Sequence, residues 1–236
     1  MRRMQQQPLL GILGGMGPLA TVDFLRKLTQ LTPARCDQEH LPWITVSQPG
    51  IPDRSRAIEN HDAGPRLYLT EAVAWLAQQG VDLIAIPCST SHFWFDAMQS
   101  ASSVPIVHIA DAAVAELQCC LPRQAGAVAV LGTRGMIRSG MYAARLAAAD
   151  FASFALGEAE QLALESIIAA VKGGDVAAAR VRMQCLTAEL AQHGVGAMIL
   201  ACTELPLACA AEPAVPLIDA SQALAKTCLR RLGYLP

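Results

Sequence analysis

The sequence predicts an α/β protein built from two similar domains, each a parallel sheet flanked by helices. Short apolar strands alternate with helical segments along the chain, and related blocks recur in the two halves. Several of the strands are continuous apolar runs, which are typical of parallel strands covered on both faces. At 236 residues, the chain is long enough for two small domains with separate cores.

An internal duplication is indicated by pairs of similar blocks that occur in the same order in both halves. In the first pair an apolar strand runs into a glycine loop, and in the second a buried strand leads to a cysteine and a hydroxyl residue. The pairs are LLGILGGMG (9–17) with VAVLGTRG (128–135), GVDLIAIPCST (80–90) with GVGAMILACTE (194–204), and VPIVHIADA (104–112) with VPLIDASQA (215–223). We therefore expect two domains related by a pseudo-two-fold axis.

The individual elements follow from local signals. Residues 65–79 begin with proline and end before Gly80, which are the usual start and stop signals of a helix. Residues 175–193 repeat this pattern, with Asp175 as the N-cap and Gly194 as the stop. The other predicted elements are strands at 43–47, 83–86 and 197–200 and a last helix at 221–232.

The domain boundary is predicted to be discontinuous. The chain enters the second copy near Val107–Asp111, and this segment is echoed near Leu217–Asp219. The last helix would then return to pack on the first domain. We assign residues 1–107 with 217–236 to the first domain and residues 108–216 to the second.

Composition excludes several classes of function. A net charge of -2 and a pI near 6.2 give no basic surface for nucleic acid, and no run of eighteen apolar residues predicts a membrane span. The eight cysteines form no CxxC pair, so we predict reduced thiols in a cytoplasmic protein and no metal site. None of the lysines, Lys27, Lys172 and Lys226, lies in a convincing pyridoxal-phosphate pocket, so we predict no cofactor.

The chemistry is predicted at Cys88 and Cys202. Each cysteine follows a predicted strand, and ligands of open α/β sheets bind at the carboxyl ends of the strands. If the domains face each other, the thiols flank one cleft, where one removes a Cα proton and the other delivers a proton to the opposite face. We expect the helix N-terminus after each thiol to lower its pKa and to hold a substrate carboxylate. The alternative is that both are small buried apolar residues.

The motifs around these residues resemble the aspartate/glutamate racemase superfamily. The resemblance rests on Gly14-Gly15-Met16-Gly17-Pro18, on PCSTSH from Pro87 and on CTELPL from Cys202, and it spans nearly the whole chain. It is closest to the branch of aspartate racemases and broad-specificity amino-acid racemases. The resemblance implies the duplicated α/β fold, racemisation of an amino acid without pyridoxal phosphate, and a homodimer.

Site residues are carried over from the resemblance position by position. Cys88 and Cys202 become the catalytic pair. Other predicted contacts to the substrate carboxylate and amine are Met16, Thr90, Thr203 and, more weakly, Thr133. Arg54 matches an arginine that binds a side-chain carboxylate, although it also fits a solvated loop arginine. Glu204 either orients the neighbouring thiol or caps the helix that follows.

Two departures from the family pattern bear on the substrate. Ser89 stands where the family usually has asparagine, and its shorter hydroxyl is still a candidate contact. Aspartate racemases also carry a lysine in the second half, but residues 158–165 (EAEQLALE) contain none and Lys172 lies a turn or more later. Arg54 thus favours a dicarboxylic substrate and the missing lysine counts against one.

Rival functions remain at this point. Gly15-x-Gly17-x-x-Ala20 fits a dinucleotide-binding fingerprint, but the acidic residues Asp37 and Glu39 precede the next strand instead of ending one. Within the superfamily, cis-trans isomerases and decarboxylases share the scaffold, and a non-catalytic amino-acid-binding protein is another alternative. His92, four residues after Cys88, is interpreted as a polar residue on the following helix.

Overall fold

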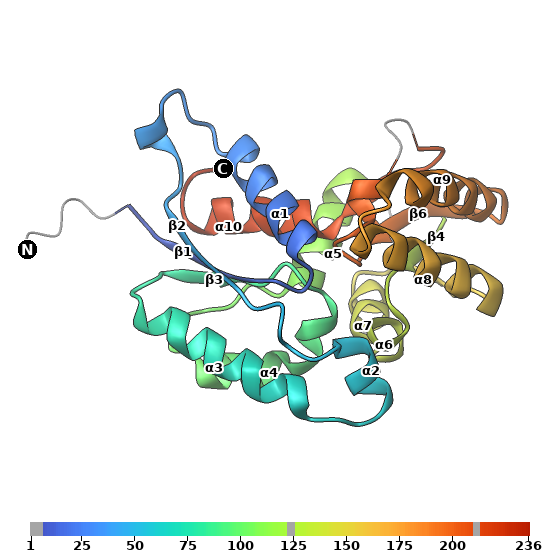
Figure 1. The fold of residues 1–236 in the computed structure, drawn as a ribbon. Coiled ribbons are helices and arrows are strands. Elements are labelled where there is room, and N and C mark those ends of the chain that lie inside the picture. The colour runs from blue at the N-terminus through green and yellow to red at the C-terminus, as the bar shows by residue number, and fades with distance from the viewer. Residues whose placement is uncertain (1–6, 122–125, 210–212) are drawn as a thin grey trace, which may run out of the picture.

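The computed structural model describes residues 7–121, 126–209 and 213–236, and it confirms an α/β fold with two parallel sheets flanked by helices. The sheets lie in separate halves of the molecule, with the first sheet beside the N-terminus (Figure 1). The strand order is β2-β1-β3 in the first sheet and β5-β4-β6-β7 in the second. The strands are β1 (Leu10–Gly14), β2 (Trp43–Ser47), β3 (Leu83–Ala85), β4 (Ala127–Leu131), β5 (Ser153–Phe154), β6 (Val195–Leu200) and β7 (Leu217–Asp219).

The two sheets repeat one topology, as the duplicated blocks predict. The first strand of each half is central, and the second lies on one side of it and the third on the other. Beyond β3, an isolated parallel bridge joins Ile84 to Ile106, in the place that β7 takes beside β6. Ile84 N–H donates to the carbonyl of Pro105 at 3.0 Å, and Met198 N–H donates to the carbonyl of Pro216 at 3.0 Å.

The helices begin and end at the signals in the sequence. The helix predicted at 65–79 is α3, and the one predicted at 175–193 is α9, where the Asp175 carboxylate accepts Ala178 N–H at 3.1 Å. The helices are α1 (Pro18–Leu31), α2 (Arg54–Glu59), α3 (Gly64–Gln78), α4 (Phe95–Ala101), α5 (Ile109–Cys120), α6 (Arg134–Arg138), α7 (Met141–Ala148), α8 (Glu158–Lys172), α9 (Val176–Gln192) and α10 (Ala220–Arg231). Short 3-10 helices are η1 (Asp37–Glu39), η2 (Thr90–Trp94) and η3 (Leu205–Ala208).

Side-chain alternation along the central strands divides the core into layers. In β1, Leu10 and Ile12 face a core shared with α1, α5 and α10, whereas Leu13 faces the α3 and α4 side. In β4, Val130 faces the shared core and Leu131 faces α8 and α9. One apolar core therefore continues from the first half into the second through α5 and α10, which lie between the two sheets (Figure 1).

The chain crosses between the halves twice. The first crossing is α5, and the second is the turn from β7 into α10, which packs against both α1 and α5. Near the predicted boundary at residue 217, Ile218 of β7 pairs with Ile199 in the second sheet. The division between the sheets therefore falls after Asp219, and only α10 packs on the first half.

A buried lysine ties α1 to this second crossing. The Lys27 ammonium contacts the carboxylate of Asp23 on its own helix and lies 2.5 Å from the carboxylate of Asp219 at the end of β7. Asp219 also caps α10 by accepting the N–H of Gln222 at 3.0 Å. Because Lys27 is buried, removal of either carboxylate would leave part of its charge without compensation, which is strongly destabilising.

Two further features bear on the predictions from composition. All eight cysteines, each within the described residues, are free thiols. In the described part of the chain, no helix combines the length and the apolar character needed to cross a membrane.

Candidate active site

The glycine loop after β1 forms one wall of the cleft between the halves. A Cβ atom on Gly14 would lie 2.2 Å from Thr21 Cγ2, and Gly15 has a φ of +91° and would place a Cβ 2.3 Å from the backbone nitrogen of Gln48. The Thr21 hydroxyl accepts the N–H of Gly15 at 2.8 Å and donates to the carbonyl of Gly17 at 2.9 Å. These contacts hold the loop in the form that places Met16 against the cleft.

Cys88 and Cys202 line the same small pocket. Both thiols are buried, and they follow β3 and β6, at the carboxyl ends of the strands. The pocket has a volume of about 30 Å³ and is lined by residues of both halves. Every residue predicted for the site lines it: Met16, Arg54, Cys88, Ser89, Thr90, Thr133, Cys202, Thr203 and Glu204.

The residue that follows each cysteine makes a hydrogen bond to the opposite half. The Ser89 and Tyr142 hydroxyls share a hydrogen bond at 2.9 Å, and the Thr203 hydroxyl donates to the carbonyl of Pro87 at 3.0 Å. Burial raises the pKa of Tyr142, so its hydroxyl is protonated at neutral pH. The residue in place of the family asparagine is therefore held by a tyrosine of the other half.

The second residue after each cysteine also crosses between the halves. Thr90 shares a hydrogen bond with Thr133 at 3.0 Å between the hydroxyl oxygens. At the matching position, the Glu204 carboxylate accepts the N–H of Gly17 at 3.1 Å. Each contact reaches the glycine loop of the opposite half, so the walls of the pocket repeat a common geometry.

The halves approach each other tightly where α2 meets α6. Gly135 N–H donates to the Ser55 hydroxyl at 2.8 Å. A Cβ on Gly135 would lie 2.6 Å from Ser55 Oγ, 2.7 Å from its Cα and 2.8 Å from its carbonyl oxygen. Two of these atoms belong to the backbone, so only glycine fits without a shift of one half against the other.

The thiol of Cys202 is held in its protonated form, contrary to the expectation that a helix N-terminus would lower its pKa. Burial, followed by the adjacent Glu204 carboxylate, raises the pKa of Cys202 well above its usual value. The thiol donates to Glu204 Oε2 at 3.0 Å. The segment after it is η3, a 3-10 helix of 4 residues whose N-cap, Glu204, makes no side-chain capping hydrogen bond. Of the two roles predicted for Glu204, the geometry favours contact with the thiol.

The backbone at Cys88 is fixed by two side chains that follow it. Its carbonyl accepts the Ser91 hydroxyl at 2.7 Å and lies 2.9 Å from His92 Nδ1. On its other side, His92 Nε2 lies 3.3 Å from both the carbonyl of Val107 and the N–H of Ile109. Burial lowers the pKa of His92 to about 4 and keeps the imidazole neutral. His92 thus lies in η2, with a buried structural role at the Cys88 loop.

Two cations line the outer side of the pocket. Arg54 begins α2, where its Nη1 donates to the carbonyls of Ile51 and Pro52 at 3.0 and 3.1 Å, while its buried Nε has no hydrogen-bond partner. Lys172, at the end of α8, lines the same pocket. Arg54, Lys172 and Glu204 also border an adjoining vestibule of about 280 Å³.

The expectation that the second half lacks a lysine at the site was therefore wrong. The family pattern predicts this lysine within residues 158–165, at the start of α8. The helix runs for 15 residues, and its last residue, Lys172, reaches the cleft. The length of this helix was the signal that could have identified the lysine.

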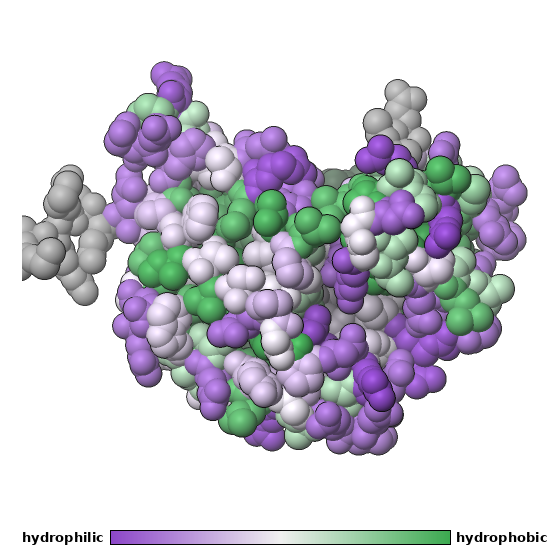
Figure 2. Space-filling view, viewed as in Figure 1, coloured by the Kyte–Doolittle hydropathy of each residue, from purple (hydrophilic) through white to green (hydrophobic). Residues whose placement is uncertain are grey.

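Apolar side chains form the outer part of the vestibule. Pro18, Leu19 and Pro49 line it beyond the two cations. In the space-filling view the outline is notched between the two halves, and apolar side chains lie near the N-terminal end of α1 (Figure 2). The cleft is therefore polar and tight at the thiols and wider and more apolar toward solvent.

The sequence did not indicate several other residues at the site. Asp53 and Ser55 also line the pocket, and Tyr142 approaches it from α7. Their positions depend on how α2 and α7 dock across the cleft, and no motif marks them. Among the residues that the structure describes, no group of three or more His, Cys, Asp or Glu side chains is arranged to hold a metal ion.

Comparison with known proteins gives the relationship of this chain. Residues 13–228 match the Asp/Glu/hydantoin racemase family. The chain belongs to the Asp/Glu/hydantoin racemase family. A relative within it, the broad-specificity amino-acid racemase RacX of Bacillus subtilis, is 32% identical over 225 residues, covering 93% of this chain and 96% of the relative.

Solved structures of the racemase family share the fold. An aspartate racemase from Picrophilus torridus superposes with a TM-score of 0.85 at 29% identity, covering 96% of this chain and 94% of the other. A glutamate racemase from Francisella tularensis, at 19% identity, has a TM-score of 0.69 over 99% of this chain and 84% of its own. The second match shows that the two-domain fold extends to more distant members.

Family membership confirms the resemblance that the motifs predicted. With the relatives above, it also confirms the predicted class of enzyme, a racemase, which is a class of isomerase.

Proposed function

We propose that this protein racemises a free amino acid at Cα, with Cys88 and Cys202 as the two proton-transfer groups and without a bound cofactor. The observation that supports this most is that two buried thiols, from matching positions of the two halves, line one pocket. Two-base proton transfer needs an acid and a base on opposite sides of one carbon, and this duplicated arrangement supplies a thiol from each half.

The protonation states suggest how the two thiols divide the work. Cys202 carries its proton, because burial and Glu204 raise its pKa. We infer that the Cys88 thiolate removes the Cα proton while the Cys202 thiol protonates the opposite face of the planar carbanion. Afterwards Cys88 is a thiol and Cys202 is a thiolate, which is the form that acts on the other enantiomer. The raised pKa makes the Cys202 thiolate a strong base.

Substrate binding would use the hydroxyl groups between the thiols. Thr90, Thr133 and Thr203 all line the pocket, and their hydroxyls can pair with the α-carboxylate and the ammonium group of an amino acid. Glu204 is the one carboxylate that borders both this pocket and the vestibule. Its position supports a contact with the substrate ammonium in addition to the Cys202 thiol.

We further propose an acidic amino acid, such as aspartate or glutamate, as the preferred substrate. Arg54 and Lys172 border both the pocket and the vestibule. Among the described residues, the Lys172 ammonium has no hydrogen bond or ion pair, and Arg54 Nε is buried without a partner. A side-chain carboxylate would satisfy both cations through charge-assisted hydrogen bonds.

Exchange in heavy water tests the reaction directly. Purified protein without added cofactor should exchange solvent deuterium into the α-position of aspartate or glutamate, as measured by proton NMR, and should form the opposite enantiomer.

Cys88→Ser and Cys202→Ser should each lower racemisation by about a thousand-fold or more, because one face loses its proton-transfer group. Cys228→Ala, at a buried thiol of α10, is the control that should retain activity. Full activity in both serine variants would overturn the mechanism.

The substrate class has a separate test. Lys172→Met should lower kcat/KM for aspartate by about ten- to a hundred-fold, because a hydrogen bond between charged groups is lost. The same variant should leave kcat/KM for alanine within about two-fold, since alanine has no side-chain carboxylate. Equal losses for both substrates would remove the case for an acidic side chain.

The homodimer implied by the resemblance and the cytoplasmic location predicted from the reduced thiols stay predictions. Sedimentation of the purified protein and fractionation of the source cells would check them.

A further inference from the structure

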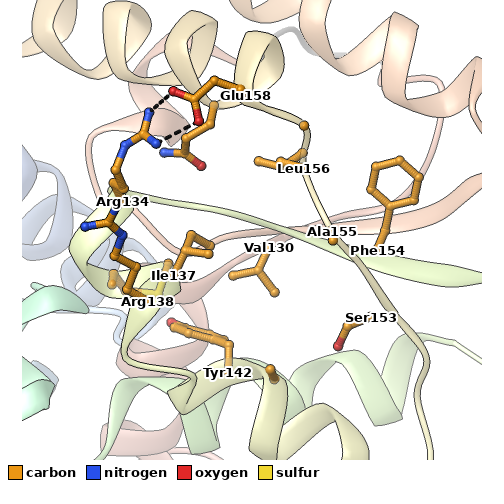
Figure 3. A pocket seen from close by; sticks show the side chains of 14 residues that line it. Val130, Arg134, Ile137, Arg138, Tyr142, Ser153, Phe154, Ala155, Leu156 and Glu158 are labelled. Atoms are coloured by element: carbon orange, nitrogen blue, oxygen red, sulfur yellow. Dashed lines mark hydrogen bonds and ion pairs between the residues drawn. The ribbon is translucent and has the colours of Figure 1, made fainter.

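A second pocket lies in the second half of the molecule, away from the candidate active site. Its volume is about 320 Å³, within the range of small-molecule sites, and it shares no lining residue with the thiol pocket. Residues of β4, α6, α7, β5 and the start of α8 surround it. In Figure 3, Val130, Ile137 and Tyr142 lie across an open space from Phe154 and Leu156.

The chemistry of this pocket combines apolar walls with positive charge at the rim. Both Nη atoms of Arg134 donate to Glu158 at 2.9 Å, and its Nε donates to Glu165 at 3.1 Å. Arg138, beside it in Figure 3, is exposed and has no hydrogen bond or ion pair among the described residues. The Arg134 guanidinium is therefore compensated by two carboxylates, whereas Arg138 has only a longer-range attraction to Glu158 and can pair with a bound anion.

Tyr142 connects this pocket to the thiol pocket. Its ring lines the second pocket, and its hydroxyl shares the 2.9 Å hydrogen bond with Ser89. Ser89 is adjacent to Cys88 in the chain and lines the thiol pocket. One side chain therefore forms a wall of the second pocket and a support of the site at which we place the chemistry.

We propose that the second pocket binds a small monocarboxylate with an apolar body, and that this ligand activates the enzyme through Tyr142. The apolar body fills the space against the tyrosine ring, and the carboxylate pairs with Arg138 at the rim. The bound ligand restrains the ring, so the hydroxyl stays on Ser89 and the Cys88 loop is held in place. The effect on activity depends on the proposed racemase function, whereas the binding does not.

Binding is tested first, with 4-phenylbutyrate as the probe and calorimetry or ligand-observed NMR as the readout. We expect saturable binding that aspartate does not displace. Ala155→Trp, at an exposed alanine that lines the pocket, should abolish it, while Ala152→Trp, at an exposed alanine nearby that does not line the pocket, should leave it unchanged. Displacement by aspartate, or equal binding to the Ala155→Trp variant, would overturn the proposal.

The charge at the rim is tested with a neutral probe of the same shape. 4-Phenylbutanamide should bind about two- to five-fold more weakly than the carboxylate, which is the scale of an exposed ion pair. In Arg138→Gln the two probes should bind equally. A preference for the carboxylate that survives this substitution would contradict the role of Arg138.

The connection to the active site is tested by Tyr142→Phe, which keeps the ring and removes the hydroxyl. In the unchanged protein, saturating 4-phenylbutyrate should raise kcat/KM by about five-fold. In the variant the probe should still bind within about three-fold of its original affinity and should no longer change kcat/KM. An equal activation in the variant would overturn the coupling.

If sedimentation shows that Ala155→Trp separates a dimer, the pocket is an interface between copies and the ligand proposal is wrong.

Discussion

The surroundings of Cys88 and Cys202 differ although the two residues hold equivalent positions in the duplicated blocks. Each cysteine follows the third strand of its half. The two residues after each cysteine form hydrogen bonds to the other half. At the second position, however, Thr90 presents a hydroxyl and Glu204 presents a carboxylate that contacts the neighbouring thiol. The duplication therefore repeats the geometry of the site without repeating its charge.

This difference shows how a duplicated scaffold can place two equivalent thiols in unlike surroundings. The carboxylate and the burial around Cys202 favour the protonated form. Around Cys88 the contacts are to its backbone carbonyl, from Ser91 and His92. A racemase must begin each turnover with one acid and one base, so an unequal environment for equivalent residues suits the proposed reaction.

Among changes to the residues beside the two thiols, the largest effect is expected from Glu204→Gln, which removes the difference in charge. The amide cannot accept the charge-assisted hydrogen bond of the Cys202 thiol or pair with the substrate ammonium, and kcat should fall about a hundred-fold, on the scale of general acid-base catalysis. The pKa of Cys202 should also fall, because the carboxylate is one of the causes that raise it. Alkylation by iodoacetamide as a function of pH, read out at Cys202 by mass spectrometry, measures this shift.

Thr90→Val is the matched control for Glu204→Gln. It removes the hydrogen bond to Thr133 and leaves the charge near Cys202 unchanged. We expect about a ten-fold loss of activity and no change in the pH profile of Cys202 alkylation. A similar shift in both variants would mean that the difference between the halves does not arise from Glu204.

An intermediate effect is expected at the tight contact between α2 and α6. Gly135→Ala should destabilise the protein by about 1–3 kcal/mol, because the new methyl group overlaps backbone atoms of Ser55. Gly50→Ala, where an added Cβ meets nothing within 4 Å, is the control. Thermal and urea unfolding measure the change. Equal stability of the two variants would show that α2 and α6 adjust to each other freely.

Acidification is expected to lower the stability of the fold by a smaller amount, through His92 in the first half. The folded protein lowers the pKa of His92 from 6.5 to about 4, so between these values the unfolded chain binds a proton that the folded protein excludes. Stability should therefore fall as pH falls through this window, by about 1 kcal/mol between pH 7 and pH 5.5 from this residue. Urea unfolding at both pH values, with His92→Asn as the comparison, measures it. An unchanged pH dependence in the variant would show that His92 does not contribute.

At alkaline pH, the buried thiol of Cys202 is expected to lower the stability of the fold. The raised pKa of Cys202 means that the folded protein retains a proton that the unfolded chain releases above about pH 9. Burial likewise raises the pKa of Cys209 to about 11. Burial also raises the pKa of Cys228 on α10, so stability should decline as pH rises past 9. Urea unfolding at pH 8 and pH 10 measures this decline.

Much of this arrangement could be predicted from the sequence, because duplicated motifs carry information about both halves. The cysteines and the hydroxyl residues beside them are local to strand ends, and parallel strands bring their carboxyl ends to one edge. Gly14 and Gly15 are likewise explained by local geometry, since Thr21 and Gln48 leave no room for a side chain.

The remaining features depend on distances that the sequence does not encode locally. Lys172 lies at the cleft because α8 extends for 15 residues and ends there. Tyr142 contacts Ser89 because α7 of the second half packs beside the Cys88 loop of the first half. The raised pKa of Cys202 follows from burial and from the rotamer of Glu204, neither of which a motif specifies. The pairing of Ile218 similarly depends on a tertiary contact, because β7 adds to the second sheet beside β6.

The double crossing of the chain at α5 and α10 restricts how a substrate can enter. A volume of about 30 Å³ is enough for a few water molecules, so we infer that the cleft at the thiols widens to admit an amino acid. Because α5 and α10 pack together and share a continuous core, we expect that side of the molecule to stay closed. The opening would then be a hinge rotation about these helices, which breaks the hydrogen bonds of Thr90, Ser89 and Gly135 across the cleft.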